Sequence, residues 1–131
     1  MSLNIENVKA WMDVLRQASI RPDFFVDDAA IDAYLDARDM DPFDQNWSSA
    51  HDALSNALTS LSRQERDAIE SLQAHAGEQS YMAVIRQTGS AELAAYASDD
   101  VRLVIAYVAL GKVDTFVSSM REAYERGEFP A

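Results

Sequence analysis

Hydrophobic residues recur every three or four positions along most of the chain. In the first segment such positions include Ile5, Val8 and Met12, and charged residues fill the opposite side. This period is typical of an amphipathic helix, so the sequence predicts a helix over residues 4–19 that ends before Pro22. Similar patterns predict a second helix from Asp27 or Asp28 to about Arg38 and a third from Asp41 or Asp44 to about Leu61. Five more helices are predicted after these: one from Ser62 to Gly77, a short one ending at Gly89, one capped by Ser90, one over 100–110 capped by Ser98 or Asp99, and one ending at Gly127.

The glycines support this helical interpretation. Each of the four falls where a helix is expected to end: Gly77, Gly89, Gly111 and Gly127. Glycine reaches the left-handed backbone conformation of that position without a Cβ clash. Short strands over 81–88 and 101–110 are the alternative, but no Asn-Gly or Asp-Gly turn accompanies them. We therefore predict an all-α fold, a compact bundle of six to eight short helices forming a single domain over residues 1–131.

The longest apolar run covers residues 103–110, and 101–110 is expected to be the central helix. A membrane-spanning helix needs about 20 apolar residues, so the sequence predicts a soluble protein without membrane contact. Arg102, directly before the run, is the base expected to be partly buried.

The chain carries a formal net charge of −11, with 22 acids against 11 bases, and contains no cysteine. The lack of cysteine excludes disulfides, thiolate metal sites and a cysteine nucleophile, and it fits a reducing, cytoplasmic location. Nucleic acids and anionic membranes attract basic surfaces, so neither is expected as a partner. A basic protein is the natural partner of such a chain.

The acids are concentrated in residues 23–44, which we call the acidic window. It holds eight aspartates and one base, Arg38, a formal charge of about −7. Asp28, Asp32 and Asp36 recur at every fourth position and share a helix face, where each pair of like charges costs about 0.2–0.5 kcal/mol. A solvated surface would tolerate this repulsion, but a docking site for a basic partner would explain it.

Aromatic residues in or beside the acidic window strengthen the docking interpretation, because tight interfaces combine aromatic anchors with surrounding charge. Each aromatic taken alone could equally belong to the core. The predicted partner-binding residues are Asp28, Asp32, Asp36, Asp39, Phe24, Phe25, Tyr34, Phe43 and Trp47.

No catalytic, cofactor-binding or metal site is predicted. Asp39, Asp41 and Asp44 resemble the start of a calcium loop, but positions 5, 6 and 12 of that loop hold the wrong residues. His51 and His75 lack the Glu-x-x-His and His-Glu-x-x-His patterns of metal sites. The four glycines are all assigned to helix ends, which leaves none for a phosphate-binding loop.

The sequence thus predicts a non-catalytic protein-interaction domain that binds a basic protein through the acidic window. In size, acidity and lack of cysteine it is similar to immunity proteins, the small helical inhibitors of basic toxins, although no motif identifies a family. Two alternatives stay open: a small-ligand-binding or hydrolytic helical domain with a pocket between helices, and a homo-oligomeric structural subunit.

Overall fold

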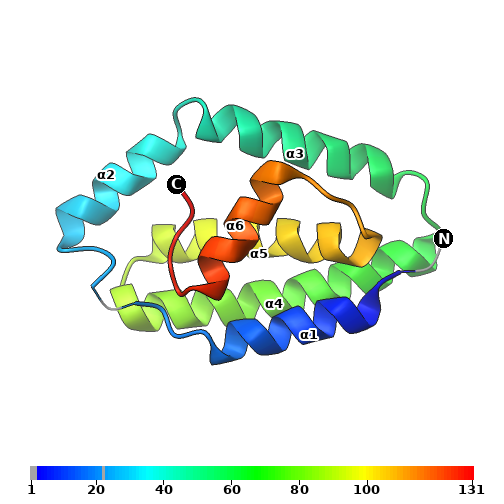
Figure 1. Cartoon of the computed structure of the whole chain (residues 1–131), viewed down its shortest axis with the longest axis horizontal. Helices are drawn as coiled ribbons and strands as arrows, with labels where there is room; N and C mark the ends of the chain where they lie inside the picture. Colours follow the sequence, from blue (N-terminus) through cyan, green and yellow to red (C-terminus); the bar gives the residue numbers. More distant parts are fainter. Residues whose placement is uncertain (1–2, 22) are drawn as a thin grey trace.

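Six helices connected by short segments make up the computed structural model, which describes residues 3–21 and 23–131 (Figure 1). Their bounds are α1 Ile5–Gln17, α2 Asp28–Arg38, α3 Phe43–Leu58, α4 Arg63–Thr88, α5 Ala91–Leu110 and α6 Thr115–Glu125. These described ranges contain no strand, which confirms the predicted all-α class.

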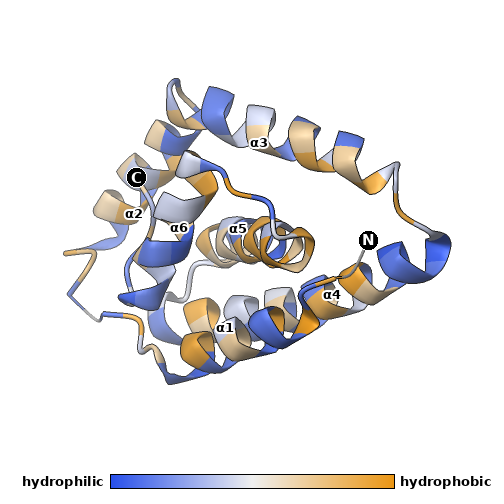
Figure 2. Ribbon diagram, turned by 45° about the vertical axis from the view of Figure 1, so that its right-hand side comes forward, coloured by the Kyte–Doolittle hydropathy of each residue, from blue (hydrophilic) through white to orange (hydrophobic). Residues whose placement is uncertain are grey.

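Helix α5 is the centre of the molecule, as its apolar sequence predicted. Val101, Val104 and Ile105 are fully buried, and α5 contacts α1, α3, α4 and α6. Figure 2 shows α5 almost end-on and mostly hydrophobic, with the other helices around it. Ten of the buried hydrophobic residues belong to α5, so this one helix supplies a large share of the apolar area whose burial drives folding.

Gly77 does not end a helix, so that prediction is wrong. It lies within the 26 residues of α4, and a Cβ atom there would stand 2.5 Å from Arg102 Nε and 2.9 Å from Ser98 Oγ of α5. The glycine thus permits a close approach of α4 to α5, which outweighs its intrinsic cost of about 1 kcal/mol within a helix.

The expected helix start at Ser98 or Asp99 is also wrong, because both residues lie inside α5. Ser90 caps this helix by accepting a hydrogen bond from Leu93 N. The remaining three glycines do follow helices in the left-handed conformation, with φ between 64° and 72°. The helix count therefore falls at the lower end of the predicted six to eight.

Local capping explains where several helices begin. Asp27 Oδ1 accepts a hydrogen bond from Ala30 N at the start of α2, and Ser62 and Glu65 form the capping box of α4. Helix α3 begins at Phe43. The first helix ends at Gln17, two residues earlier than predicted, and Pro22, its predicted boundary, lies outside the described residues.

Helices α2 and α3 run along one edge of the molecule, and α6 crosses in front of α5 (Figure 1). The C-terminal segment returns beside α6 toward α2. Among the described residues, no single helix is both long and apolar enough to span a membrane. Only α5 and α6 taken together reach the length and hydropathy of a membrane span, and the two helices are bent by 116° at their junction.

Candidate functional site

The acidic window lies on the outside of the molecule. All eight of its aspartates are exposed, whereas Ile31, Leu35 and Arg38 on the inner face of α2 are buried. The helical period that places these three residues against the core directs the i, i+4 stripe of Asp28, Asp32 and Asp36 outward.

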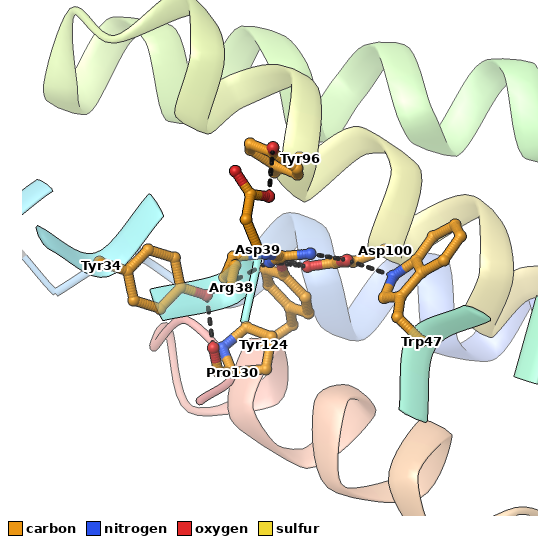
Figure 3. Close-up of polar contacts among 8 residues, drawn as sticks. All are labelled: Tyr34, Arg38, Asp39, Trp47, Tyr96, Asp100, Tyr124 and Pro130. Atoms are coloured by element: carbon orange, nitrogen blue, oxygen red, sulfur yellow. Dashed lines mark hydrogen bonds and ion pairs between the residues drawn. The ribbon is translucent and has the colours of Figure 1, made fainter. Parts of the chain in front are cut away.

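Arg38, the only base of the acidic window, points inward. Its side chain is 5% exposed and forms a two-pronged ion pair with Asp100 of α5, whose side chain is fully buried. The Arg38 Nη1–Asp100 Oδ2 and Nη2–Asp100 Oδ1 distances are 2.7 and 2.6 Å (Figure 3). Because Asp100 neutralises Arg38 in the interior, the base does not compensate the exposed carboxylates of the window.

The outer carboxylates receive little compensation from elsewhere. Arg21 Nε lies 3.7 Å from Asp23 Oδ1, and Tyr96 donates a hydrogen bond of 2.9 Å to Asp39. Within residues 3–21 and 23–131, no other base forms an ion pair with the eight aspartates. The exterior of the window therefore carries about eight negative charges against the one base Arg21.

Hydrogen bonds to Asp100 of α5 connect this helix to three others, α2, α3 and α6. Besides the two bonds from Arg38, its carboxylate accepts hydrogen bonds from Trp47 Nε1 of α3 at 2.9 Å and from the Tyr124 hydroxyl of α6 at 2.5 Å. Figure 3 shows these donors converging on the one side chain. A buried carboxylate that is paired and fully hydrogen-bonded can be accommodated in the core.

Aromatic rings enclose the guanidinium of Arg38. Its Cζ atom lies 4.5 Å from the ring centre of Phe43 and 4.8 Å from that of Tyr96. Burial lowers the pKa of Arg38, but the hydrogen bonds and charge of Asp100 raise it by more, so the side chain stays protonated. Its Nε is a buried side-chain nitrogen without a hydrogen-bond partner among the described residues.

Two phenols, of the half-buried Tyr34 and the buried Tyr124, extend this network toward the C-terminal segment. Tyr34 accepts a hydrogen bond from Arg38 Nη1 at 3.3 Å and donates one to the carbonyl of Pro130. Burial raises the pKa of Tyr34 to about 12, and burial together with the charge of Asp100 raises the pKa of Tyr124 well above its ordinary value. Both hydroxyls therefore remain donors at neutral pH.

The aromatics predicted for partner binding fall into two groups. Phe24, Phe25 and Tyr34 are half-buried and pack around Phe129 of the C-terminal segment, with ring centres 4.8–6.1 Å apart. In the second group Phe43 is buried and Trp47 half-buried. Much of each ring therefore contributes to packing, and the aspartates supply most of the exposed surface of the predicted set.

Phe43 packs edge to face against Phe116 of α6, with ring centres 5.1 Å apart. Trp47 stacks on His51 at 5.4 Å. Phe43 thus faces α6, and Trp47, which donates to Asp100, faces α5.

The identity of the buried base differs from the prediction, because Arg102 is exposed and Arg38 is buried. A local signal existed: Arg38 shares its helix face with the apolar residues Ile31 and Leu35. Asp100, also missed, lies three residues after Ala97 and four before Val104 on a buried face. Each charge could enter the core only because the other does, and that pairing spans 62 positions of sequence.

A groove of about 900 Å³ lies beside the acidic window, between the α2–α3 turn and the start of α6. Phe43, Pro42 and Phe116 are among its lining residues. In the part of the chain that the structure describes, no three His, Asp or Glu side chains come together as a possible metal site.

A protein-family model described as immunity protein PIM1 matches residues 10–131. The match includes the whole acidic window, the Arg38–Asp100 pair and the groove. A comparison with curated proteins finds no match.

Proposed function

The chain belongs to the PIM1 family of immunity proteins, and on this premise we propose that it inhibits a basic protein toxin by binding it through the acidic window. Membership of an immunity family implies a protein partner such as a toxin. The basic character of that partner and the surface that binds it are the content of the proposal.

The observation that carries the proposal is the uncompensated charge on the exterior. Eight exposed aspartates lie within 22 residues, and their only internal base is buried against Asp100. A concentrated charge of one sign speeds encounter with an oppositely charged protein by about 10- to 1,000-fold at low salt. Such steering decreases with ionic strength, because the Debye length is only about 8 Å in physiological salt.

Folding does not require most of these carboxylates. Asp27 and Asp41 accept backbone hydrogen bonds near helix starts, but Asp28, Asp32 and Asp36 accept none from the described residues. Their mutual repulsion costs the isolated protein about 0.4–1 kcal/mol over two i, i+4 pairs. A basic partner would convert this cost into favourable binding energy.

The proposed inhibition needs no chemistry on the toxin. A bound immunity protein can cover the toxin's basic surface and exclude its target from it. We also propose that the protein acts in the cytoplasm, whose reducing conditions fit the absence of cysteine.

Reversal of the acid stripe tests the proposal. The cognate toxin would be sought among the products of the adjacent genes. Carrying an inactivating substitution, it would be titrated with the wild type and with a triple variant, Asp28→Lys, Asp32→Lys and Asp36→Lys. We expect the triple variant to bind at least about tenfold more slowly, to lose the salt dependence of association, and to keep a circular-dichroism melt close to that of the wild type.

A matched control separates a specific surface from total charge. Glu6, Glu70 and Glu122 are exposed on α1, α4 and α6, and their reversal to lysine changes the net charge equally. We expect this control to retain most of the binding rate. Equal loss in both triple variants, or undiminished binding of the stripe variant, would refute the assignment to the acidic window.

A further inference from the structure

We infer that the groove between the α2–α3 turn and α6 receives an apolar side chain of the toxin that is flanked by lysine or arginine. This inference rests on the proposed function and specifies the recognition chemistry of the same surface. It assigns the apolar contact to the groove and the steering to the acidic stripe.

The groove has the walls of an anchor site. Its volume is about 900 Å³, and Met40, Pro42, Phe43 and Phe116 contribute apolar lining. Phe43 is 9% exposed and packs edge to face on Phe116, so the floor is held by the core. Hot-spot side chains of interfaces insert into well-packed pockets that lose their water on binding.

Met40 provides an adaptable edge to the groove. Its side chain is 66% exposed, so it lies at the open side of the groove. Methionine is flexible and polarisable, and it adjusts to the shape of an incoming apolar group.

The charges around the groove define the class of occupant. Its charged lining side chains are Arg38, Asp41 and Asp114, and Arg38 is neutralised by Asp100. The remaining two carboxylates, together with the adjoining window, repel anions and favour cations. A segment with an apolar residue between basic residues matches both the walls and the edges.

The groove is also continuous with the proposed interface. Half of its lining, from Tyr34 to Phe43, belongs to the acidic window itself. One partner segment can therefore contact the carboxylates and the groove together, which gives the usual arrangement of an apolar centre within a charged rim.

Two matched pairs of variants test the inference. Met40 and Val26 are both exposed apolar residues of the acidic window, at 66% and 89%, but only Met40 lines the groove. We expect Met40→Ser to weaken binding of the inactivated cognate toxin by about tenfold, mainly through faster dissociation, and Val26→Ser to change affinity less than about twofold.

The second pair fills the groove at constant charge. Ser48 and Ser49 are adjacent and exposed on α3, and only Ser49 lines the groove. Ser49→Arg should abolish binding, whereas Ser48→Arg, with the same change in net charge, should retain it. Thermal melts of all four variants by circular dichroism would verify folding.

The outcomes distinguish the groove from the proposed function. If Met40→Ser and Ser49→Arg bind like their controls while the acid-stripe reversal still slows binding, the groove inference is overturned and the proposed function stands. If the wild type does not bind the toxin, both are overturned. Light scattering adds a third outcome. If the groove variants dissociate a dimer of this chain without changing the affinity for the toxin, the groove is occupied by a second copy of the chain, and the inference is overturned.

Discussion

Removing one member of the Arg38–Asp100 pair should destabilise the protein strongly. The two side chains are 5% and 0% exposed, and either single substitution leaves a buried charge without its counter-ion. Breaking a buried pair in this way costs about 3–5 kcal/mol, out of a total stability of about 5–15 kcal/mol for a domain. Arg38→Met and Asp100→Asn should therefore each consume a large part of the stability.

The double variant discriminates between a coupled pair and two independent contacts. Asparagine keeps an oxygen that can accept from Trp47 or Tyr124, and methionine removes the charge that Asp100 neutralises. Arg38→Met with Asp100→Asn should therefore cost clearly less than the sum of the single variants, with a coupling of about 2–3 kcal/mol. Urea unfolding followed by tryptophan fluorescence would measure this cycle.

An exposed Arg–Asp pair serves as the control. Arg63 Nε and Asp67 Oδ2 are 3.9 Å apart, with side chains 90% and 66% exposed. Arg63→Met should change stability by less than about 1 kcal/mol. Single losses at Arg38 or Asp100 as small as this, or additive losses in the double variant, would refute the reasoning.

Two further predictions concern a glycine and a carboxylate near the C-terminus. Gly89 and Gly127 share φ +72°, but a Cβ at Gly89 meets nothing within 4 Å, whereas one at Gly127 lies 1.9 Å from the carbonyl oxygen of Ser19. Gly89→Ala should therefore lower the free energy of unfolding by about 1–2 kcal/mol, and Gly127→Ala should lower it by about 1–3 kcal/mol more. Equal melting temperatures of the two variants would contradict this. The hydrogen bond from Arg126 lowers the pKa of Glu128. Ionised Glu128 therefore stabilises the fold at any pH above the ordinary glutamate pKa of about 4.3. This contribution is lost as the pH falls through the lowered pKa. Urea unfolding should show Glu128→Gln less stable than the wild type at pH 7 and equal to it near about pH 2; a difference independent of pH would contradict the assignment.

Local patterns were sufficient to predict the class of fold and the central helix. The period of Ile5 and Val8, the capping box of Ser62, and the apolar run that became the second half of α5 each act over one or two helical turns. Where they erred, tertiary packing decided: Gly77 is an efficient helix terminator in isolation, but in the folded protein it allows α4 to lie close against Ser98 of α5.

The candidate site was only partly predictable. Exposure of the stripe follows from its period, because the same helix must turn Ile31 and Leu35 toward the core. The burial of Arg38 against Asp100, and the packing of Phe25 on Phe129, join residues far apart in the sequence. No local pattern encodes which distant carboxylate or ring will complete such a contact.

The division of α2 into an inner and an outer face has an evolutionary consequence. Its inner residues are constrained by the core, since Arg38 pairs there with the buried Asp100. Its outer aspartates are free of that constraint, because in the described part of the chain no backbone N–H or base bonds to the side chain of Asp28, Asp32 or Asp36. Mutations can accumulate on the outer face without unfolding the protein, so natural selection can alter its recognition properties while the scaffold is inherited unchanged.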